Sequence, residues 1–274
     1  MSRFRLRMLS AISAAVALLA LAGVAAAANV VVSPGHMDGW AVNNDTCGAA
    51  TTGSVAFVNG PATPPAGTGS VQFTVGANGD SYPTVRQSDY NGVKLSALTA
   101  FDYSTYVSHA GSGSQAAYID LYVDNNNDGV RDDILTFEPV YQTSQGPVVL
   151  NTWQHWNALT GLWWSDAMGG PPPLFTLSSY IASHPDARIV NAGGGGVILA
   201  AGCGGAAWTG FVGNADKLTI GANTYDFEAT QPTPPPKPGN RNHKVLVCHK
   251  GHTISIDSHA LPAHLRHGDK KGAC

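Results

Sequence analysis

The stretch AYIDLYVDNNNDGVRDDILTFEPVY, from Ala117 to Tyr141, decides the fold class of this chain. Ile119, Leu121 and Val123 alternate with polar or aromatic residues, and this period of two indicates a strand with one buried face. After a loop rich in Asp, Asn and Gly, the alternation resumes over residues 134–138. Two such runs joined by a short polar loop predict an antiparallel hairpin.

Short runs of the same kind recur on both sides of the hairpin, separated by Pro and Gly breakers. Only residues 177–183 look helical, and Pro185 ends that segment. Many short strands without alternating helices predict an all-β fold, an antiparallel sandwich or jelly roll. The other expected strands are 29–32, 54–58, 70–75, 100–108, 153–159, 188–191, 197–201, 209–212, 217–220 and 224–227.

The N-terminus is typical of a secretory signal peptide spanning residues 1–28. Three arginines precede an apolar, Ala-rich run, and we expect cleavage after Ala28. The alternative is an uncleaved membrane anchor, which the Ala-rich run and its A-x-A ending disfavour. No other stretch is apolar and long enough to span a bilayer. We therefore expect a secreted protein, located outside the cell, at its surface or in a periplasm.

The net charge of the chain argues against one class of partner, and its cysteines indicate disulfides. The formal net charge is −3, and loss of the three signal arginines makes it −6. Such a chain lacks the basic stripe that nucleic acid requires. Four cysteines in an oxidising compartment favour two disulfides, for which the sequence alone allows three pairings. Proximity suggests Cys47 with Cys203 and Cys248 with Cys274, one bridge in each expected part of the chain.

A proline-rich stretch divides the chain into two parts. Residues 229–243 read ATQPTPPPKPGNRNH, which predicts an extended linker between a main domain at 29–228 and a small unit at 244–274. In the small unit we expect strands at 245–249 and 253–256, with a turn at Gly251. A short helix should follow near residues 259–267, ended by Gly268.

The loop of the hairpin is a candidate calcium site. Oxygen-bearing side chains alternate along it and a glycine allows the sharp turn that such a loop needs. A full EF-hand is excluded because Leu135 stands where the bidentate glutamate would be. A plain polar turn is the alternative. The expected ligands are Asp124, Asn126, Asp128 and Asp132.

The segment WQHWNALTGLWW concentrates tryptophans that could bind carbohydrate. Exposed aromatic faces stack on sugar rings, whereas the same side chains could equally fill the core. Alternation places Trp153 and Trp156 on opposite faces of one strand, so at least one of them could be outside. The candidate sugar-binding residues are Trp153, Trp156, Trp163 and Trp164.

The small unit at 244–274 carries a second candidate metal site. His264 and His267 are three residues apart, so on a helix they share a face. Together with His249, and with Cys248 and Cys274 as thiolates, they could bind Zn²⁺. The alternative is a Cys248–Cys274 disulfide, which export favours and which leaves room for a site built from histidines alone.

Two parts of the sequence resemble known exported proteins. The ending GFVGNADKLTIGANTYDFE, residues 210–228, and a strand directly after the signal resemble the lectin-like, concanavalin-A-like β-sandwiches of bacterial surface proteins. That resemblance implies carbohydrate binding. The CHKG, HLRHGD and final Cys of the tail resemble a small unit found at the C-terminus of various bacterial exported proteins. It implies an accessory module.

These observations predict a secreted, non-catalytic protein that binds a surface glycan or another extracellular ligand. Two alternatives stay open. The first is a jelly-roll polysaccharide hydrolase or lyase that uses Glu138, although no catalytic motif is present. The second is a purely structural surface or matrix protein. A carboxylate-lined groove beside exposed aromatic residues would favour the enzyme, and exposed aromatic residues without such a groove would favour binding.

Overall fold

The computed structural model describes residues 28–48, 53–231 and 244–274. The chain divides into two compact units, Met1–Gln231 and Pro232–Cys274, so the division lies within the proline-rich stretch. The expected signal peptide, apart from Ala28, and the linker from residue 232 onwards lie outside the described residues. Within the described part of the chain, no helix has the length and apolar character required to cross a membrane.

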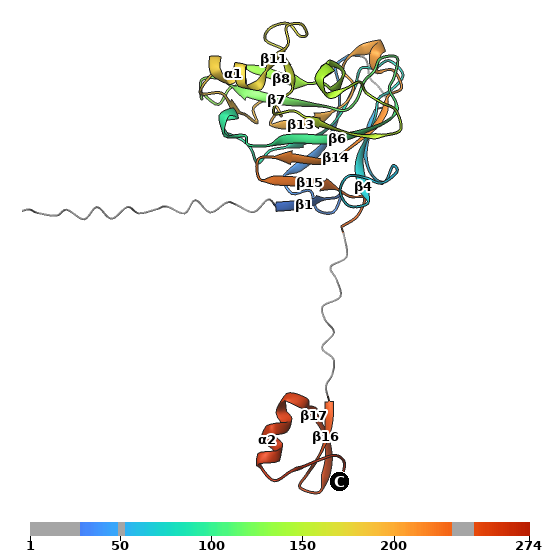
Figure 1. Cartoon of the computed structure of the whole chain (residues 1–274), viewed down its shortest axis with the longest axis vertical. Helices are drawn as coiled ribbons and strands as arrows, with labels where there is room; N and C mark the ends of the chain where they lie inside the picture. Colours follow the sequence, from blue (N-terminus) through green and yellow to red (C-terminus); the bar gives the residue numbers. More distant parts are fainter. Residues whose placement is uncertain (1–27, 49–52, 232–243) are drawn as a thin grey trace, which may run out of the picture. The chain divides into compact units, whose positions relative to one another are not determined.

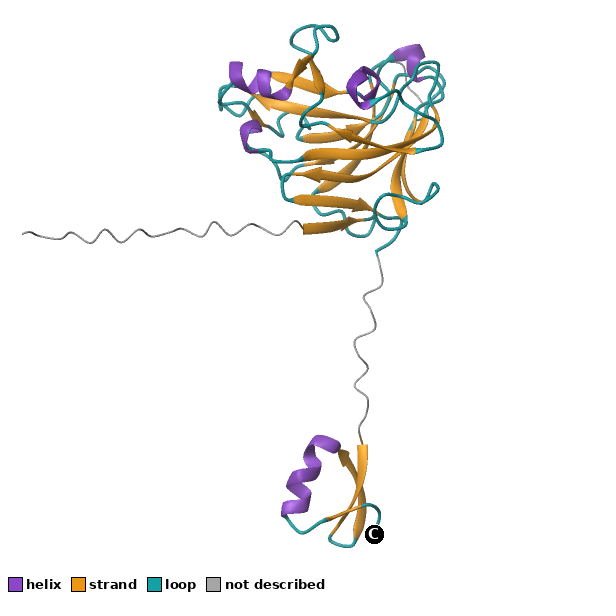
Figure 2. Ribbon diagram, in the orientation of Figure 1, coloured by secondary structure: helices purple, strands orange, loops and turns teal. Residues whose placement is uncertain are grey.

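The main unit is an all-β, sandwich-like fold of two sheets (Figures 1 and 2). In the first sheet, β1 pairs in parallel with β15, and the other pairings are antiparallel. Its seven strands are β1 (Ala28–Val32), β3 (Ser54–Asn59), β4 (Gly69–Thr74), β6 (Phe101–His109), β9 (Trp153–Asn157), β14 (Val212–Ile220) and β15 (Asn223–Phe227).

The second sheet is antiparallel throughout and contains the predicted hairpin. Its central order is β11-β10-β8-β7-β13-β5-β2, and β12 also pairs with β7. Its eight strands are β2 (Trp40–Thr46), β5 (Ser81–Gln87), β7 (Tyr118–Asp124), β8 (Asp133–Phe137), β10 (Leu162–Ser165), β11 (Phe175–Thr176), β12 (Arg188–Ile189) and β13 (Val197–Ala200).

Helical segments of the main unit are short. The helix α1 (Leu177–Ser183) begins after Thr176, whose side chain accepts a hydrogen bond from the backbone N–H of Ser179. This helix agrees with the predicted one. The 3₁₀ turns are η1 (Leu95–Ala97), η2 (Pro139–Tyr141), η3 (Thr143–Gln145) and η4 (Gly205–Trp208).

The two sheets share one hydrophobic core. Tyr103 of the first sheet packs edge-on against Phe137 of the second, with ring centroids 6.0 Å apart. Phe101 and Trp163 stack across the same interface at 5.8 Å. The predicted inward residues of β7, Ile119, Leu121 and Val123, are completely buried. The alternation of that strand therefore identified its core face correctly.

Two strand predictions need correction, and four strands of the main unit were not predicted. The predicted strand 209–212 is wrong, because residues up to Trp208 form η4 and β14 begins only at Val212. Residues 217–220 are the end of that strand, after a register shift next to Lys217, whose φ is +52°. The strands that were not predicted are β2, β5, β10 and β11. β2 and β5 are rich in polar residues, and Pro83 interrupts the β pattern of β5, whereas β10 and β11 have only four and two residues.

The C-terminal unit has a small sheet and one helix. Strands β16 (Lys244–His249), β17 (His252–Asp257) and β18 (Lys270–Lys271) form the sheet in the order β17-β16-β18. A 3₁₀ turn, η5 (Ser258–Ala260), leads into α2 (Leu261–Arg266). Gly268 has a φ of +89° just after the helix, a conformation that glycine adopts without steric cost. The predicted hairpin and helix of this unit are confirmed.

Candidate functional site

A cleft of about 460 Å³ lies on the side of the second sheet that faces away from the core. The strand register explains which side chains reach it. Asp120 of β7 is opposite Thr136 of β8, and Thr136 is opposite Trp164 of β10. Because side chains two residues apart share a face, Tyr118, Tyr122, Ile134, Glu138 and Asp166 lie on the same side. All of them line the cleft.

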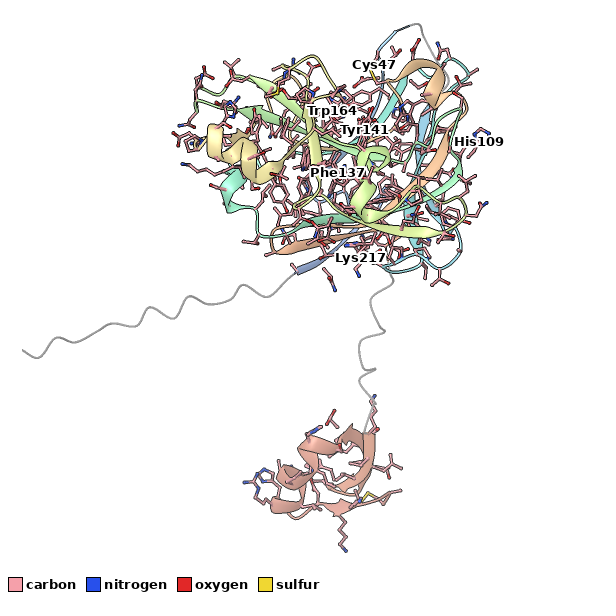
Figure 3. The ribbon with its side chains drawn as sticks, turned by 45° about the horizontal axis from the view of Figure 1, so that its top comes forward. Cys47, His109, Phe137, Tyr141, Trp164 and Lys217 are labelled. Atoms are coloured by element: carbon pink, nitrogen blue, oxygen red, sulfur yellow. A yellow bond between two sulfur atoms is a disulfide. The ribbon has the colours of Figure 1, made fainter. Side chains whose placement is uncertain are left out.

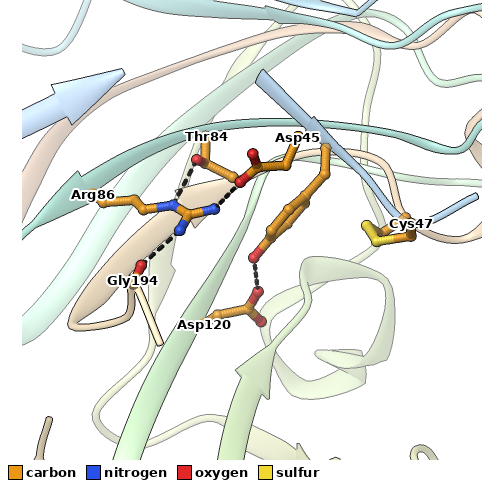
Figure 4. Close-up of polar contacts among 8 residues, drawn as sticks. Asp45, Cys47, Thr84, Arg86, Asp120 and Gly194 are labelled. Atoms are coloured by element: carbon orange, nitrogen blue, oxygen red, sulfur yellow. Dashed lines mark hydrogen bonds and ion pairs between the residues drawn. A yellow bond between two sulfur atoms is a disulfide. The ribbon is translucent and has the colours of Figure 1, made fainter. Parts of the chain in front are cut away.

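Asp120 is the buried carboxylate of this cleft. The Tyr82 hydroxyl donates a hydrogen bond to it at 2.6 Å (Figure 4). The Thr136 hydroxyl donates a second one, also at 2.6 Å. Burial raises the pKa of Asp120 to about 6, although both hydrogen bonds and the charge of Arg86 act in the opposite direction. Asp120 therefore titrates near neutral pH.

Arg86 makes its contacts at the edge of this region. Its guanidinium pairs with Asp45 and donates to the Gly194 carbonyl at 2.6 Å and to the Thr84 hydroxyl at 3.0 Å (Figure 4). Among the described residues that line the cleft, none is Lys, Arg or His. The cleft is therefore acidic.

Glu138 is half-buried and more accessible than Asp120. The indole N–H of Trp164 donates to its Oε2 at 2.9 Å. Burial raises the pKa of Glu138 to about 7, and the charge of Asp120 adds to the effect. The two residues are diagonal neighbours on paired strands, which places their backbones about 7–8 Å apart. The cleft thus contains two carboxyl groups with raised pKa values, and that of Glu138 is the higher of the two.

Aromatic side chains surround these carboxyl groups. Trp164 and Tyr141 are both labelled in Figure 3. Burial, followed by the charge of Glu138, raises the pKa of Tyr141, so its hydroxyl stays protonated and can donate a hydrogen bond. The aromatic lining comprises Tyr82, Tyr118, Tyr122, Tyr141, Trp164 and Trp208.

The Cys47–Cys203 disulfide forms part of the cleft rim. It links the chain just after β2 to the loop that follows β13, so two segments 156 residues apart in sequence are held together beside the site. The predicted pairing of these cysteines is confirmed. Gly202, with a φ of +89°, lies next to Cys203 and allows the sharp turn there.

Only one of the four candidate tryptophans lies in the cleft. Trp164 lines it and is half-buried. Trp156 and Trp163 are completely buried, so their assignment as sugar-binding residues is wrong and they belong to the core. Trp153, on β9 of the other sheet, packs against Tyr106 at 5.6 Å and donates to the Pro61 carbonyl at 2.9 Å.

The calcium-loop candidates form a hydrogen-bonded turn. Burial would raise the pKa of Asp124, but backbone N–H groups, those of Gly129 and Asn127 first, outweigh it and hold the pKa below its usual value. Asp128 accepts from the Val130 N–H at 2.8 Å. Asp132 accepts from the Asn125 N–H at 2.7 Å, and Asn126 from the Asp128 N–H at 2.9 Å. Calcium binding by this loop stays a prediction.

The C-terminal unit holds a group of possible metal ligands. Cys248 and Cys274 form the predicted disulfide, so the alternative with thiolate ligands is wrong. Among the described residues, one group of His, Cys, Asp or Glu side chains brings at least three ligand atoms within 4.8 Å of one another, and it comprises His249, His264 and Asp269. His267 is exposed and lies outside this group.

Comparison of the chain with protein-family models, curated proteins and solved structures gave no match. The site therefore has to be understood from its own residues. Sequence patterns missed Asp166 and the tyrosines of the cleft, because nothing local distinguishes them from ordinary strand residues. Asp269 is the last residue of the HLRHGD segment, but the spacing of the histidines alone does not identify it as a metal ligand.

Proposed function

We propose that the main unit is an exported glycan-binding domain and that the cleft over β7, β8 and β10 is its binding site. The observation that carries this proposal is the alternation of aromatic and carboxyl side chains over one concave face. Aromatic rings offer flat apolar surfaces to the C–H faces of sugars. Carboxyl and phenol groups placed between them can hydrogen-bond sugar hydroxyls. The volume also falls within the range of small-molecule sites.

The charge of the lining narrows the class of glycan. Asp120, Glu138 and Asp166 contribute carboxyl groups to one cleft, and its described lining offers no cationic side chain in return. A uronic acid or a sulfated sugar would meet like charges there. A neutral glycan, or one with amino sugars, fits the site better. The two disulfides agree with export to an oxidising compartment.

Changing Trp164 to Ala should weaken glycan binding at least tenfold, because the change removes the half-exposed ring of the cleft and the donor to Glu138. A glycan array with the mature chain, residues 29–274, identifies the ligand, and calorimetry then measures its affinity. Trp153→Ala is the matched control, since that ring lies on the other sheet and should leave affinity unchanged. Equal affinity in Trp164→Ala and the unmodified protein would contradict the proposed site.

The raised pKa values favour a second candidate function, the hydrolysis of a polysaccharide. Glycosidases use two carboxyl groups that flank the bond to be cleaved, one protonated as the acid and one ionised. Glu138 has the higher pKa and the greater exposure, so it would act as the acid. Asp120, with the lower pKa, would act as the base or nucleophile. Asp166 also borders this part of the cleft.

If the cleft is catalytic, Glu138→Gln should reduce hydrolysis by at least a hundredfold and leave glycan affinity within about threefold. The rate should fall as pH rises through about 7, because Glu138 loses its proton. It should also fall as pH drops below about 6, because Asp120 gains one. Reducing-sugar release, measured across this pH range, shows whether the rate falls on both sides. Binding without any hydrolysis at pH 6–7 would contradict the catalytic function, and glycan binding would then be the only proposed function of the cleft.

A further inference from the structure

The C-terminal unit brings together one side chain of β16, one of α2 and one from the segment between α2 and β18. The Nδ1 atom of His249 lies 2.7 Å from Oδ2 of Asp269. The Nδ1 atom of His264 lies 2.8 Å from the same oxygen. The two imidazole rings are nearly perpendicular, with centroids 5.6 Å apart, so they approach the carboxylate from different directions. We call this group the His-His-Asp triad.

The backbone explains the convergence. β18 pairs with β16 so that Lys270 is opposite Cys248, which brings Asp269 beside His249. After α2 the chain reverses at Gly268, and the Asp269 N–H donates to the His264 carbonyl at 3.1 Å. The Cys248–Cys274 disulfide fixes the strand end that carries His249. The disulfide and the pairing of β16 with β18 therefore hold the backbone on which His249 and Asp269 lie.

We propose that His249, His264 and Asp269 bind a zinc ion through the two Nδ1 atoms and one carboxylate oxygen. With bonds of about 2.0–2.1 Å, neighbouring ligands on tetrahedral zinc are about 3.3 Å apart. The two nitrogen–oxygen separations, 2.7 and 2.8 Å, are shorter by about half an ångström, and the three ligand atoms all lie within 4.8 Å of one another. A small outward movement of the Asp269 carboxylate from the two rings therefore admits the ion. The remaining coordination position is left for water, as in other three-ligand zinc sites.

The donor set selects the class of metal. Two imidazole nitrogens and one carboxylate oxygen suit zinc and similar first-row ions, whereas Ca²⁺ and Mg²⁺ prefer oxygen ligands alone. The side chains of His249 and His264 are 38% and 26% exposed. When each Nδ1 binds the metal, the proton of the neutral ring moves to Nε2, where water can accept it. The Asp269 side chain is only 7% exposed, and its carboxylate supplies a negative charge to the metal.

The test is zinc binding by the oxidised mature chain, residues 29–274, after treatment with a chelator. We expect one Zn²⁺ per chain by calorimetry and by elemental analysis of the dialysed protein. His249→Ala and His264→Ala should each weaken binding at least tenfold, and Asp269→Asn should weaken it as well. His259→Ala is the matched control: its Nδ1 also lies 2.7 Å from an aspartate oxygen, that of Asp257, but His259 is not part of the group of three ligand atoms found among the described residues.

A second readout separates this site from sulfur coordination. Co²⁺ bound by the triad should give visible absorption bands of a tetrahedral site without thiolate charge-transfer bands in the near ultraviolet. The mass of the intact variants should show both disulfides retained, which verifies that the C-terminal unit is still oxidised. Undiminished zinc affinity in His264→Ala, an equal loss in His259→Ala, or no bound zinc in the unmodified chain would each overturn the proposal.

Discussion

Replacing Cys248 and Cys274 together by Ser should unfold the C-terminal unit and leave the main unit folded. Val247 is the only residue of the described part of this unit that is buried and apolar. A core that small cannot offset an ordering cost of about 1.5 kcal/mol per residue. The disulfide joins residues 26 apart in sequence, which contributes about 3 kcal/mol in the chain-entropy model.

Hydrogen exchange of a chain that spans residues 29–274, read by mass spectrometry, measures this effect unit by unit. We expect amides of β16 and β17 to lose their protection completely in the double variant, while those of β7 and β13 keep theirs. Cys47→Ser with Cys203→Ser is the control that should spare the C-terminal unit. Persistent protection of β16 in the Cys248 and Cys274 double variant would contradict the prediction, because the unit would then stay folded without its disulfide.

Trp163→Ala should destabilise the main unit by about 3–5 kcal/mol. The ring is completely buried between the sheets, stacks on Phe101 at 5.8 Å and packs against Phe137 at 5.5 Å. Its indole N–H donates to the Ala158 carbonyl at 2.8 Å, and the change leaves that acceptor without its partner. Large cavities of this kind cannot be closed by small movements of the neighbours.

The neighbouring Trp164 provides the matched control for this measurement. It lies on the same strand but faces the cleft and is half-buried. Trp164→Ala should cost less than half as much stability as Trp163→Ala, because no closed cavity forms. Urea unfolding followed by circular dichroism compares the two free energies of unfolding. Equal losses would contradict the assignment of the two rings to opposite faces of β10.

Local sequence patterns predicted the secondary structure of several regions well. The alternation around Leu121 predicted the β7–β8 hairpin, and its register follows from the position of the polar loop. The helix at 177–183 was also predictable, because Pro185 limits it on one side. Both disulfide pairings were predicted with one bridge in each part of the chain, and the small unit needs such a covalent link.

The cleft was harder to predict because its residues come from distant parts of the chain. Tyr82 and Asp120 are 38 residues apart and meet only because β13 lies between β5 and β7. A strand with alternating residues predicts which side chains share a face, but it does not say whether the polar face meets solvent or a cleft. Here all seven residues of β7 are buried, including Tyr118 and Tyr122 on the cleft side.

The β class, the two-part organisation around the proline-rich stretch and the acidic character of the chain can all be predicted from the amino-acid sequence. These properties depend on composition and short-range periodicity. The folded chain is needed to see that Trp164 faces the cleft while Trp163 fills the core, and that Asp269 rather than His267 joins His249 and His264. Such choices depend on which strands pair and where a chain reverses, because long-range contacts decide what a side chain faces.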